Sequence, residues 1–198
     1  IDRLALQQNT NRSNLVNQIL AEYVSMMTPE KRVSNIFKSI EDLINQCGMN
    51  IVPYVSPNQM TMSLKSSLEY KYRPTIKYEV SMYRTPQQGT IGELNVVFRT
   101  QSEELIRAMT DFFRLWTGIE SAYRHDVEIN YALYDGRFTR SISICPDRNY
   151  TNEEVGDNIS SYIQIFDKLV KGYVSGSYNS RDVEMIYLEY YNKGVGLI

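Results

Sequence analysis

The chain has 198 residues, with 21 Lys and Arg against 23 Asp and Glu, so its net charge is −2. This length allows one large or two small domains with a sizeable core, and the near-neutral charge argues against binding nucleic acid through its phosphates. Two cysteines are too few for a disulfide framework or a zinc site. The polar first twelve residues predict no signal peptide, and no apolar run of 18 residues predicts a membrane span.

Residues 1–50 are predicted to form a helical segment before an α+β domain at residues 51–198. Ser13 begins a helix that ends near Met27, and Thr28 and Pro29 suit the N-cap and first position of a second helix, closed by Gly48. The apolar stripe of the first helix consists of Leu15, Val16, Ile19, Leu20 and Tyr23. That of the second consists of Val33, Ile36, Phe37, Ile40, Leu43, Ile44 and Cys47. The two helices form either an antiparallel pair or a bent arm, and their stripes are covered by the domain or by a partner.

Alternating apolar residues predict strands between residues 51 and 99. The first, 51–55, is bounded by prolines and is therefore expected at a sheet edge. Further alternation occurs at 60–64, 68–72 and 76–83. The loop from Thr85 to Thr90 joins the last of these to a strand at 93–99, so the two form a hairpin.

A strand that feeds directly into a helix, from Gly92 to Gly118, is the clearest unit in the sequence. Thr100 and Glu103 fit a capping box at the start of the helix, and Gly118 is expected to end it. The apolar stripe, predicted to be core, consists of Leu105, Ile106, Met109, Phe112, Phe113 and Trp116.

The same strand-and-helix order repeats toward the C-terminus. A strand at 127–133 is followed by Asp135-Gly136, a type I′ turn signal, and by a returning strand that stops at Pro146. A helix follows at 159–170, and a last strand at Val183–Tyr191 is apolar on both faces. The predicted fold is therefore α+β: an N-terminal helical pair, then a mostly antiparallel sheet with two packed helices. Its C-terminal half has the ferredoxin-like order β-α-β-β-α-β.

No constellation of residues in the sequence indicates catalysis or cofactor binding. His125 is the single histidine, and no serine or cysteine motif surrounds it. The carboxylate pairs Glu103-Glu104 and Glu153-Glu154 lie in predicted first helical turns, where the helix dipole favours negative charge. Glycine-rich phosphate loops and zinc spacings do not occur. We therefore expect no enzyme, no cofactor and no metal.

An RNA-recognition module is also disfavoured, because such a module stacks bases on sheet aromatics within a basic surround. Tyr134 is the main aromatic expected on the open face, and the stretch from Gly136 to Ile144 lacks the aromatic spacing of the RNA-binding signature.

Three stretches are similar to a known class of proteins: PTIKYEVSMYR (from Pro74), GELNVVFRTQSEELIRAMTDFFRLW (from Gly92) and DVEMIYLEYY (from Asp182). Together they resemble the structural proteins of bacteriophage tails and necks, the terminator and tube subunits. The resemblance implies a non-enzymatic, ring- or tube-forming subunit of a virion, assembled in the host cytoplasm. Its partners would be copies of itself and other virion proteins, without a membrane and without recognition of a nucleic-acid sequence. The paired N-terminal helices and the helix at 159–170 have no counterpart in a tail tube.

Self-assembly is expected through the sheet edges, the Thr85–Thr90 loop and the N-terminal helices. The candidate interface residues are Thr85, Pro86, Gln87, Gln88, Tyr23 and Phe37. The alternative is a cytoplasmic ferredoxin-like binding or regulatory module that docks a protein or RNA partner. A third hypothesis is an enzyme whose site is built from residues scattered through the sequence.

Overall fold

The alternating stretches form a single antiparallel sheet in a computed structural model, which describes residues 1–7, 10–25, 27–48, 50–54, 59–68, 73–145 and 147–196. Within these residues the sheet has six strands in the order β1-β2-β3-β4-β6-β5. The strands are β1 (Ile51–Tyr54), β2 (Thr61–Ser67), β3 (Thr75–Gln87), β4 (Thr90–Arg99), β5 (Tyr131–Tyr134) and β6 (Arg137–Ser143). The edge position of β1 and the β3–β4 hairpin are as predicted, and the mixed α+β class is confirmed.

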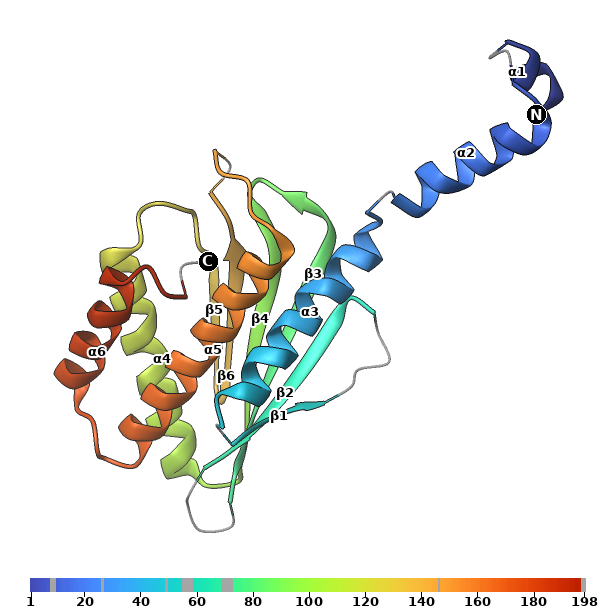
Figure 1. Cartoon of the computed structure of the whole chain (residues 1–198). Helices are drawn as coiled ribbons and strands as arrows, with labels where there is room; N and C mark the ends of the chain where they lie inside the picture. The colour runs from blue at the N-terminus through green and yellow to red at the C-terminus, as the bar shows by residue number, and fades with distance from the viewer. Residues whose placement is uncertain are drawn as a thin grey trace.

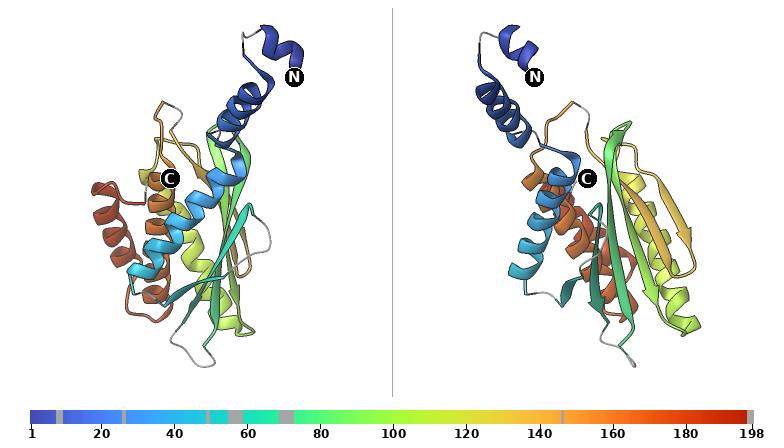
Figure 2. Two further views of the ribbon diagram at one scale, coloured as in Figure 1. Left: turned by 45° about the vertical axis from the view of Figure 1, so that its right-hand side comes forward. Right: turned by 90° about the vertical axis from the view of Figure 1, so that its right-hand side faces the viewer.

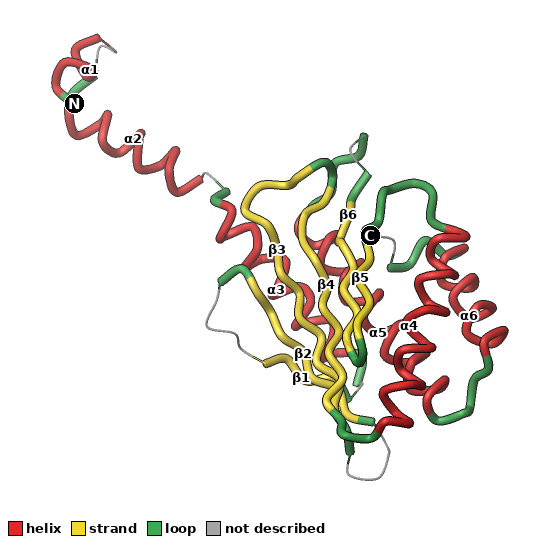
Figure 3. The backbone as a smooth tube through the Cα atoms, turned by 180° about the vertical axis from the view of Figure 1, so that it is seen from behind, coloured by secondary structure: helices red, strands yellow, loops and turns green. Residues whose placement is uncertain are grey.

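Helices cover one face of this sheet, and the opposite face is open (Figures 1 and 3). The helices of the body are α3 (Pro29–Gln46), α4 (Glu103–Tyr123), α5 (Asn152–Val174) and α6 (Ser180–Asn192). Two further helices, α1 (Asp2–Gln7) and α2 (Arg12–Ser25), form an arm that extends away from the body, as Figure 2 shows from two more sides.

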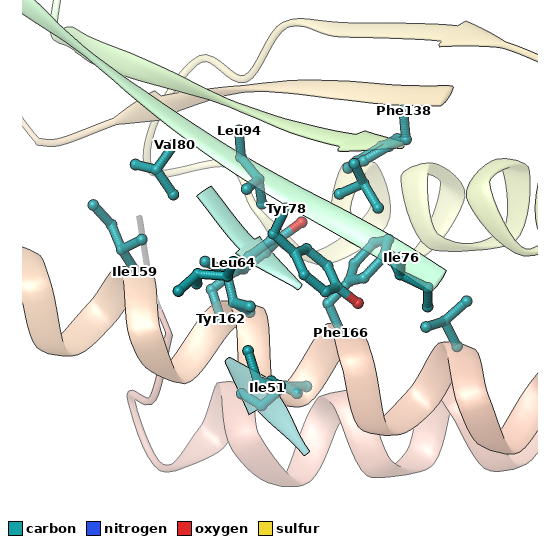
Figure 4. Packing of buried hydrophobic residues seen from close by; sticks show 14 of the residues in the cluster. Ile51, Leu64, Ile76, Tyr78, Val80, Leu94, Phe138, Ile159, Tyr162 and Phe166 are labelled. Carbon is teal, nitrogen blue, oxygen red and sulfur yellow. The ribbon is translucent and has the colours of Figure 1, made fainter. Parts of the chain in front are cut away.

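Aromatic rings fill the core between the helices and the sheet. The ring centroid of Phe166 on α5 lies 5.1 Å from that of Trp116 on α4 and 5.5 Å from that of Phe138 on β6. Tyr78 on β3 points toward Phe166 from the sheet side (Figure 4). Phe112, Phe113 and Trp116 are fully buried, so the prediction that they belong to the core is confirmed.

The prediction of a last strand at Val183–Tyr191 is wrong, because these residues lie in helix α6. Asn179 caps this helix: its side chain accepts from the backbone N–H groups of Arg181 and Asp182, and the Asp182 carboxylate accepts from the Asn179 N–H. Val183 and Tyr187, four residues apart, face the core. From β4 onward the order is β-α-β-β-α-α, so the ferredoxin-like order is not formed.

Four boundaries also differ from the predictions. Ser102, not Thr100, caps α4, and the helix continues past Gly118 to Tyr123, since a glycine can stay helical where neighbouring turns are well packed. The strand predicted from 127 begins at Tyr131, and the helix predicted to end near Met27 ends at Ser25. The predicted strand at 68–72 lies largely outside the described residues.

The type I′ turn forms at the β3–β4 hairpin and not at Asp135-Gly136, where it was predicted. At Asp135-Gly136 only the glycine has a positive φ, 67°, so the turn is not type I′, although the two-residue hairpin itself is confirmed by the pairing of Tyr134 with Arg137. The loop predicted from Thr85 is mostly strand. It narrows to Gln88-Gly89, whose φ values of 49° and 84° are both positive, as a type I′ turn requires.

Candidate interaction surfaces

The arm carries apolar side chains that nothing in the described part of the chain covers. Ala5 of α1 and Leu15 of α2 are buried where the two helices meet. Further along the predicted stripe of α2, Ile19 is 48% exposed, Leu20 53% and Tyr23 67%. The start of the stripe, at Leu15, is thus covered within the arm, whereas Ile19, Leu20 and Tyr23 face solvent.

The apolar stripe of α3, in contrast, is mostly buried. Thr28 caps α3 by accepting from the Lys31 N–H, and Pro29 occupies its first turn, as predicted. Val33, Ile36, Ile40 and Ile44 are buried in the body. Helix α3 lies alongside α5, where Ser39 Oγ donates to Asp157 Oδ1 at 3.1 Å. The two N-terminal helices therefore differ: α3 belongs to the body and α2 does not.

A groove runs between the outer side of α3 and strands β1 and β2, and we call it the α3–β1 groove. Its volume is about 620 Å³. Phe37, Met62 and Pro53 form an apolar patch in its lining. Its charged lining residues all come from α3: Glu30, Lys31, Lys38 and Glu41. Polar and charged side chains thus make up most of the groove, around this apolar patch.

The tip of the β3–β4 hairpin lies at the end of the body from which the arm departs (Figures 1 and 3). Thr85, Pro86, Gln87 and Gln88 are all exposed there. Just below them, Arg84 forms an ion pair of 3.0 Å with Glu30 in the first turn of α3. This contact ties the hairpin to the helix that borders the groove.

The predicted interface residues therefore fall on three separate surfaces of one chain. Tyr23 lies on the arm, Phe37 lines the α3–β1 groove, and Thr85 to Gln88 form the hairpin tip. Within a single copy the arm extends away from the body (Figure 1).

A buried polar cluster lies between α4, α5 and β6. Arg140 and Glu120 are each 1% exposed and form an ion pair of 3.1 Å. Tyr162 Oη donates to Glu120 Oε2 at 3.0 Å and accepts from Trp116 Nε1 at 2.7 Å. Burial lowers the pKa of Arg140, but the Glu120 carboxylate together with the hydroxyls of Tyr162 and Tyr131 outweighs burial and holds that pKa above its ordinary value. Burial, reinforced by the charge of Glu120, raises the pKa of Tyr162.

This cluster has no room for a substrate. The void beside it, lined by Trp116, Tyr162 and Tyr187 among others, measures about 10 Å³, which is the size of a single water probe. Its role is to join helices to sheet across the core. Arg140 is not among the core residues predicted from the sequence, although it alternates with Phe138 and Ile142 on β6, and that period of two places it on the buried face.

A second buried carboxylate, Asp167, accepts one hydrogen bond and forms an ion pair with one lysine, although its Oδ2 has no hydrogen bond of good geometry among the described residues. Its Oδ1 accepts from Tyr78 Oη at 2.9 Å, and Lys171 Nζ lies 2.6 Å from its Oδ2. His125, in contrast, is exposed.

Among the described residues, no three His, Cys, Asp or Glu side chains gather in a way that could hold a metal ion. The same part of the chain contains no helix long and apolar enough to cross a membrane. Comparison with known proteins gives no match to a family model, to a curated protein or to a solved structure.

Proposed function

We propose that the protein is a non-enzymatic assembly subunit, in which the α1–α2 arm of one copy docks in the α3–β1 groove of the next. The observation that carries this proposal is the exposure of Ile19, Leu20 and Tyr23 on a helix that extends beyond the body. A helix of this kind has little reason to be amphipathic unless another surface covers its apolar side.

Docking would stabilise both the arm and the contact. Helix α2 has 14 residues, a length at which an isolated helix is marginal in water. Covering its exposed apolar side chains contributes about 1.5–3 kcal/mol for each large side chain that becomes fully buried. At 1.5 Å per residue the helix is about 21 Å long, so it is shorter than the 18-residue α3 that borders the groove.

The arm can dock in the groove of a second copy, because every copy of the chain carries both an arm and a groove. The apolar patch of the groove, with Phe37 and Met62, matches the apolar side of α2, and the charged border of α3 would face solvent. Arm and groove are different surfaces, so the contact is heterologous: it closes into a ring or continues as a filament. Extension of the sheet through β1 is weaker, because Pro53 lacks an N–H group and blunts that edge.

This geometry supports the virion role that the resemblance to tail and neck proteins implies. A ring- or tube-forming subunit works by repeated head-to-tail contacts, and an arm that reaches a neighbouring groove makes such a contact. On this proposal the partners are copies of the chain and other virion proteins, in a particle assembled in the host cytoplasm.

Light scattering of the purified chain at tens of micromolar tests the proposal. We expect a mass above that of the 23.1 kDa monomer, and a shift to the monomer in the triple variant Ile19→Ser, Leu20→Ser, Tyr23→Ser. The matched control is Met185→Ser, which removes another exposed apolar side chain, on α6, and keeps the wild-type mass. A wild-type chain that stays monomeric would contradict the proposal.

A further inference from the structure

The open face of the sheet brings three cations together. Lys65 on β2 and Lys77 on β3 are direct cross-strand partners. On the same face, Arg99 of β4 pairs with Thr75, two residues before Lys77. Diagonal neighbours of this kind lie about 7–8 Å apart at their Cα atoms, within reach of long side chains. The three cationic residues therefore lie on adjacent strands and on the same, open face of the sheet.

This arrangement has no evident value for folding. Like charges placed directly opposite each other on a sheet are destabilising. Lys77 forms an ion pair with Glu79 on its own strand. In the described part of the chain, neither Lys65 nor Arg99 has a carboxylate oxygen within 4.0 Å. With three cations and the single carboxylate of Glu79, the cluster has a local charge of about +2. The chain as a whole has a negative net charge.

The cations border a hollow with further hydrogen-bonding groups. Its volume is about 320 Å³, and Lys65, Lys77 and Arg99 line it together with Ser63, Thr75 and Tyr54. This is at the small end of the range of ligand pockets. A fork of guanidinium donors, flanked by ammonium groups and hydroxyls, is the donor set that recognises phosphate.

We propose that this hollow binds a phosphate group, either as the free ion or on a mononucleotide. Lys65, Lys77 and Arg99 contact the phosphate oxygens and the hydroxyls of Ser63 and Thr75 donate to them. The ring of Tyr54 on the edge strand β1 is 67% exposed at the border of the hollow, and a base can stack on such a ring. Tyr54 also lines the α3–β1 groove, whereas Lys65 and Arg99 do not, so substitutions of these two cations leave the proposed arm-docking surface unchanged.

Thermal unfolding of the full chain, in sodium phosphate and in sodium chloride of equal ionic strength, tests the site. Phosphate also stabilises folded proteins in general, because it is excluded from their surfaces. The rise in Tm from chloride to phosphate is therefore expected to be larger in the wild type than in Arg99→Gln, because a ligand that binds only the folded state stabilises it. An equal rise in the two proteins would overturn the proposal.

Variants separate binding from stability. In phosphate-free buffer, Lys65→Gln is expected to raise the Tm by about 0.5–4 °C, since it removes the like-charge pair. In calorimetric titrations with phosphate, Lys65→Gln and Arg99→Gln should each weaken binding by roughly tenfold or more. Arg107→Gln, which removes an exposed cation on α4, is the control and should bind as the wild type does. Equal affinities in all four proteins would refute the site.

Titration with adenosine monophosphate distinguishes the two sources of the phosphate. If the ligand is a nucleotide, it binds more tightly than inorganic phosphate, and Tyr54→Ala removes only that difference. If the ligand is the free ion, the two bind equally in the wild type and Tyr54→Ala changes neither. The absence of binding by both would contradict the proposal.

Discussion

Glu120 on α4 and Arg140 on β6 form an ion pair in the core, with Arg140 Nε donating to both carboxylate oxygens at 3.1 and 3.2 Å. Arg140 also lies over the ring of Tyr162, with 4.5 Å between its guanidinium carbon and the ring centroid. Two buried charges are stable only while each has its partner, because the desolvation of an unpaired ion is unfavourable.

Removing one member of this pair is expected to destabilise the fold strongly. Arg140→Met leaves the Glu120 carboxylate buried and uncompensated, and should lower the free energy of unfolding by about 3–5 kcal/mol. The double variant Glu120→Leu, Arg140→Met should recover part of this loss, since neither charge then remains. Urea denaturation of the two single variants and the double variant measures the coupling. Additive effects of the two substitutions would contradict an energetic role for the pair.

Tyrosine ionisation should limit stability at high pH. Burial and the nearby carboxylate of Asp167 raise the pKa of Tyr78, and burial and Glu120 raise that of Tyr162. The folded pKa values exceed the unfolded value of about 10, so this contribution to stability is complete below pH 10. It is lost as the pH rises through the folded pKa values, because only the unfolded chain ionises readily.

Absorbance at an ultraviolet wavelength specific for tyrosinate, followed together with circular dichroism, checks this prediction. The buried tyrosines should ionise only as the fold is lost. If all of the chain's tyrosines titrate in one step near pH 10 while the fold persists, the buried hydroxyl bonds are not as described.

Two helical glycines should respond oppositely to the same substitution. A Cβ at Gly156 on α5 would lie 2.6 Å from the Ser39 Cβ and 3.0 Å from the Ile36 carbonyl oxygen on α3. Gly156→Ala is therefore expected to force the two helices apart and cost about 1–3 kcal/mol. At Gly118 on α4 a Cβ meets nothing within 4 Å, so Gly118→Ala should stabilise by about 0.5–1 kcal/mol.

Thermal or urea unfolding of both glycine variants against the wild type provides the measurement. A stabilising Gly156→Ala would show that α3 and α5 are not in close contact, and α3 would then not belong to the body.

Local signals account for the elements that the sequence predicts well. The β3–β4 pairing follows from strict alternation, and α3 and α4 follow from apolar stripes at helical spacing. Thr28 and Pro29 mark the start of α3 correctly. Helix α6 was missed because its many tyrosines give an apolar character to both faces, a feature of buried strands. Asn179 and Asp182, three residues apart, were the capping signal that indicates a helix.

Tertiary placement accounts for what the sequence does not predict. Helices α2 and α3 both carry apolar stripes, and that of α3, which enters the body, is much more strongly confined to one side of its helix than that of α2. The surface that covers the α3 stripe is set only by the fold. Glu120 and Arg140 meet only because α4 crosses β6 in the folded chain. The opposition of Lys65 and Lys77 depends on the β2–β3 register, which residue-by-residue patterns leave open.

The proposed head-to-tail contact between arm and groove predicts how mixtures of variants should behave. One variant lacks the apolar side of the arm: Ile19→Ser, Leu20→Ser, Tyr23→Ser. A second has a blocked groove: Ser34→Trp, at an exposed lining position of α3 whose side chain supports no core contact. The control for the second is Asn45→Trp, at an exposed position of α3 that is not among the lining residues.

Light scattering of these two variants, alone and in an equimolar mixture, measures whether the arm docks in the groove of a neighbouring copy. We expect each variant alone to be monomeric and the mixture to form a one-to-one heterodimer, in which the intact arm of one fills the intact groove of the other. Asn45→Trp alone should assemble as the wild type does. A mixture that stays monomeric while the wild type assembles, or a Ser34→Trp variant that assembles alone, would contradict the proposed contact.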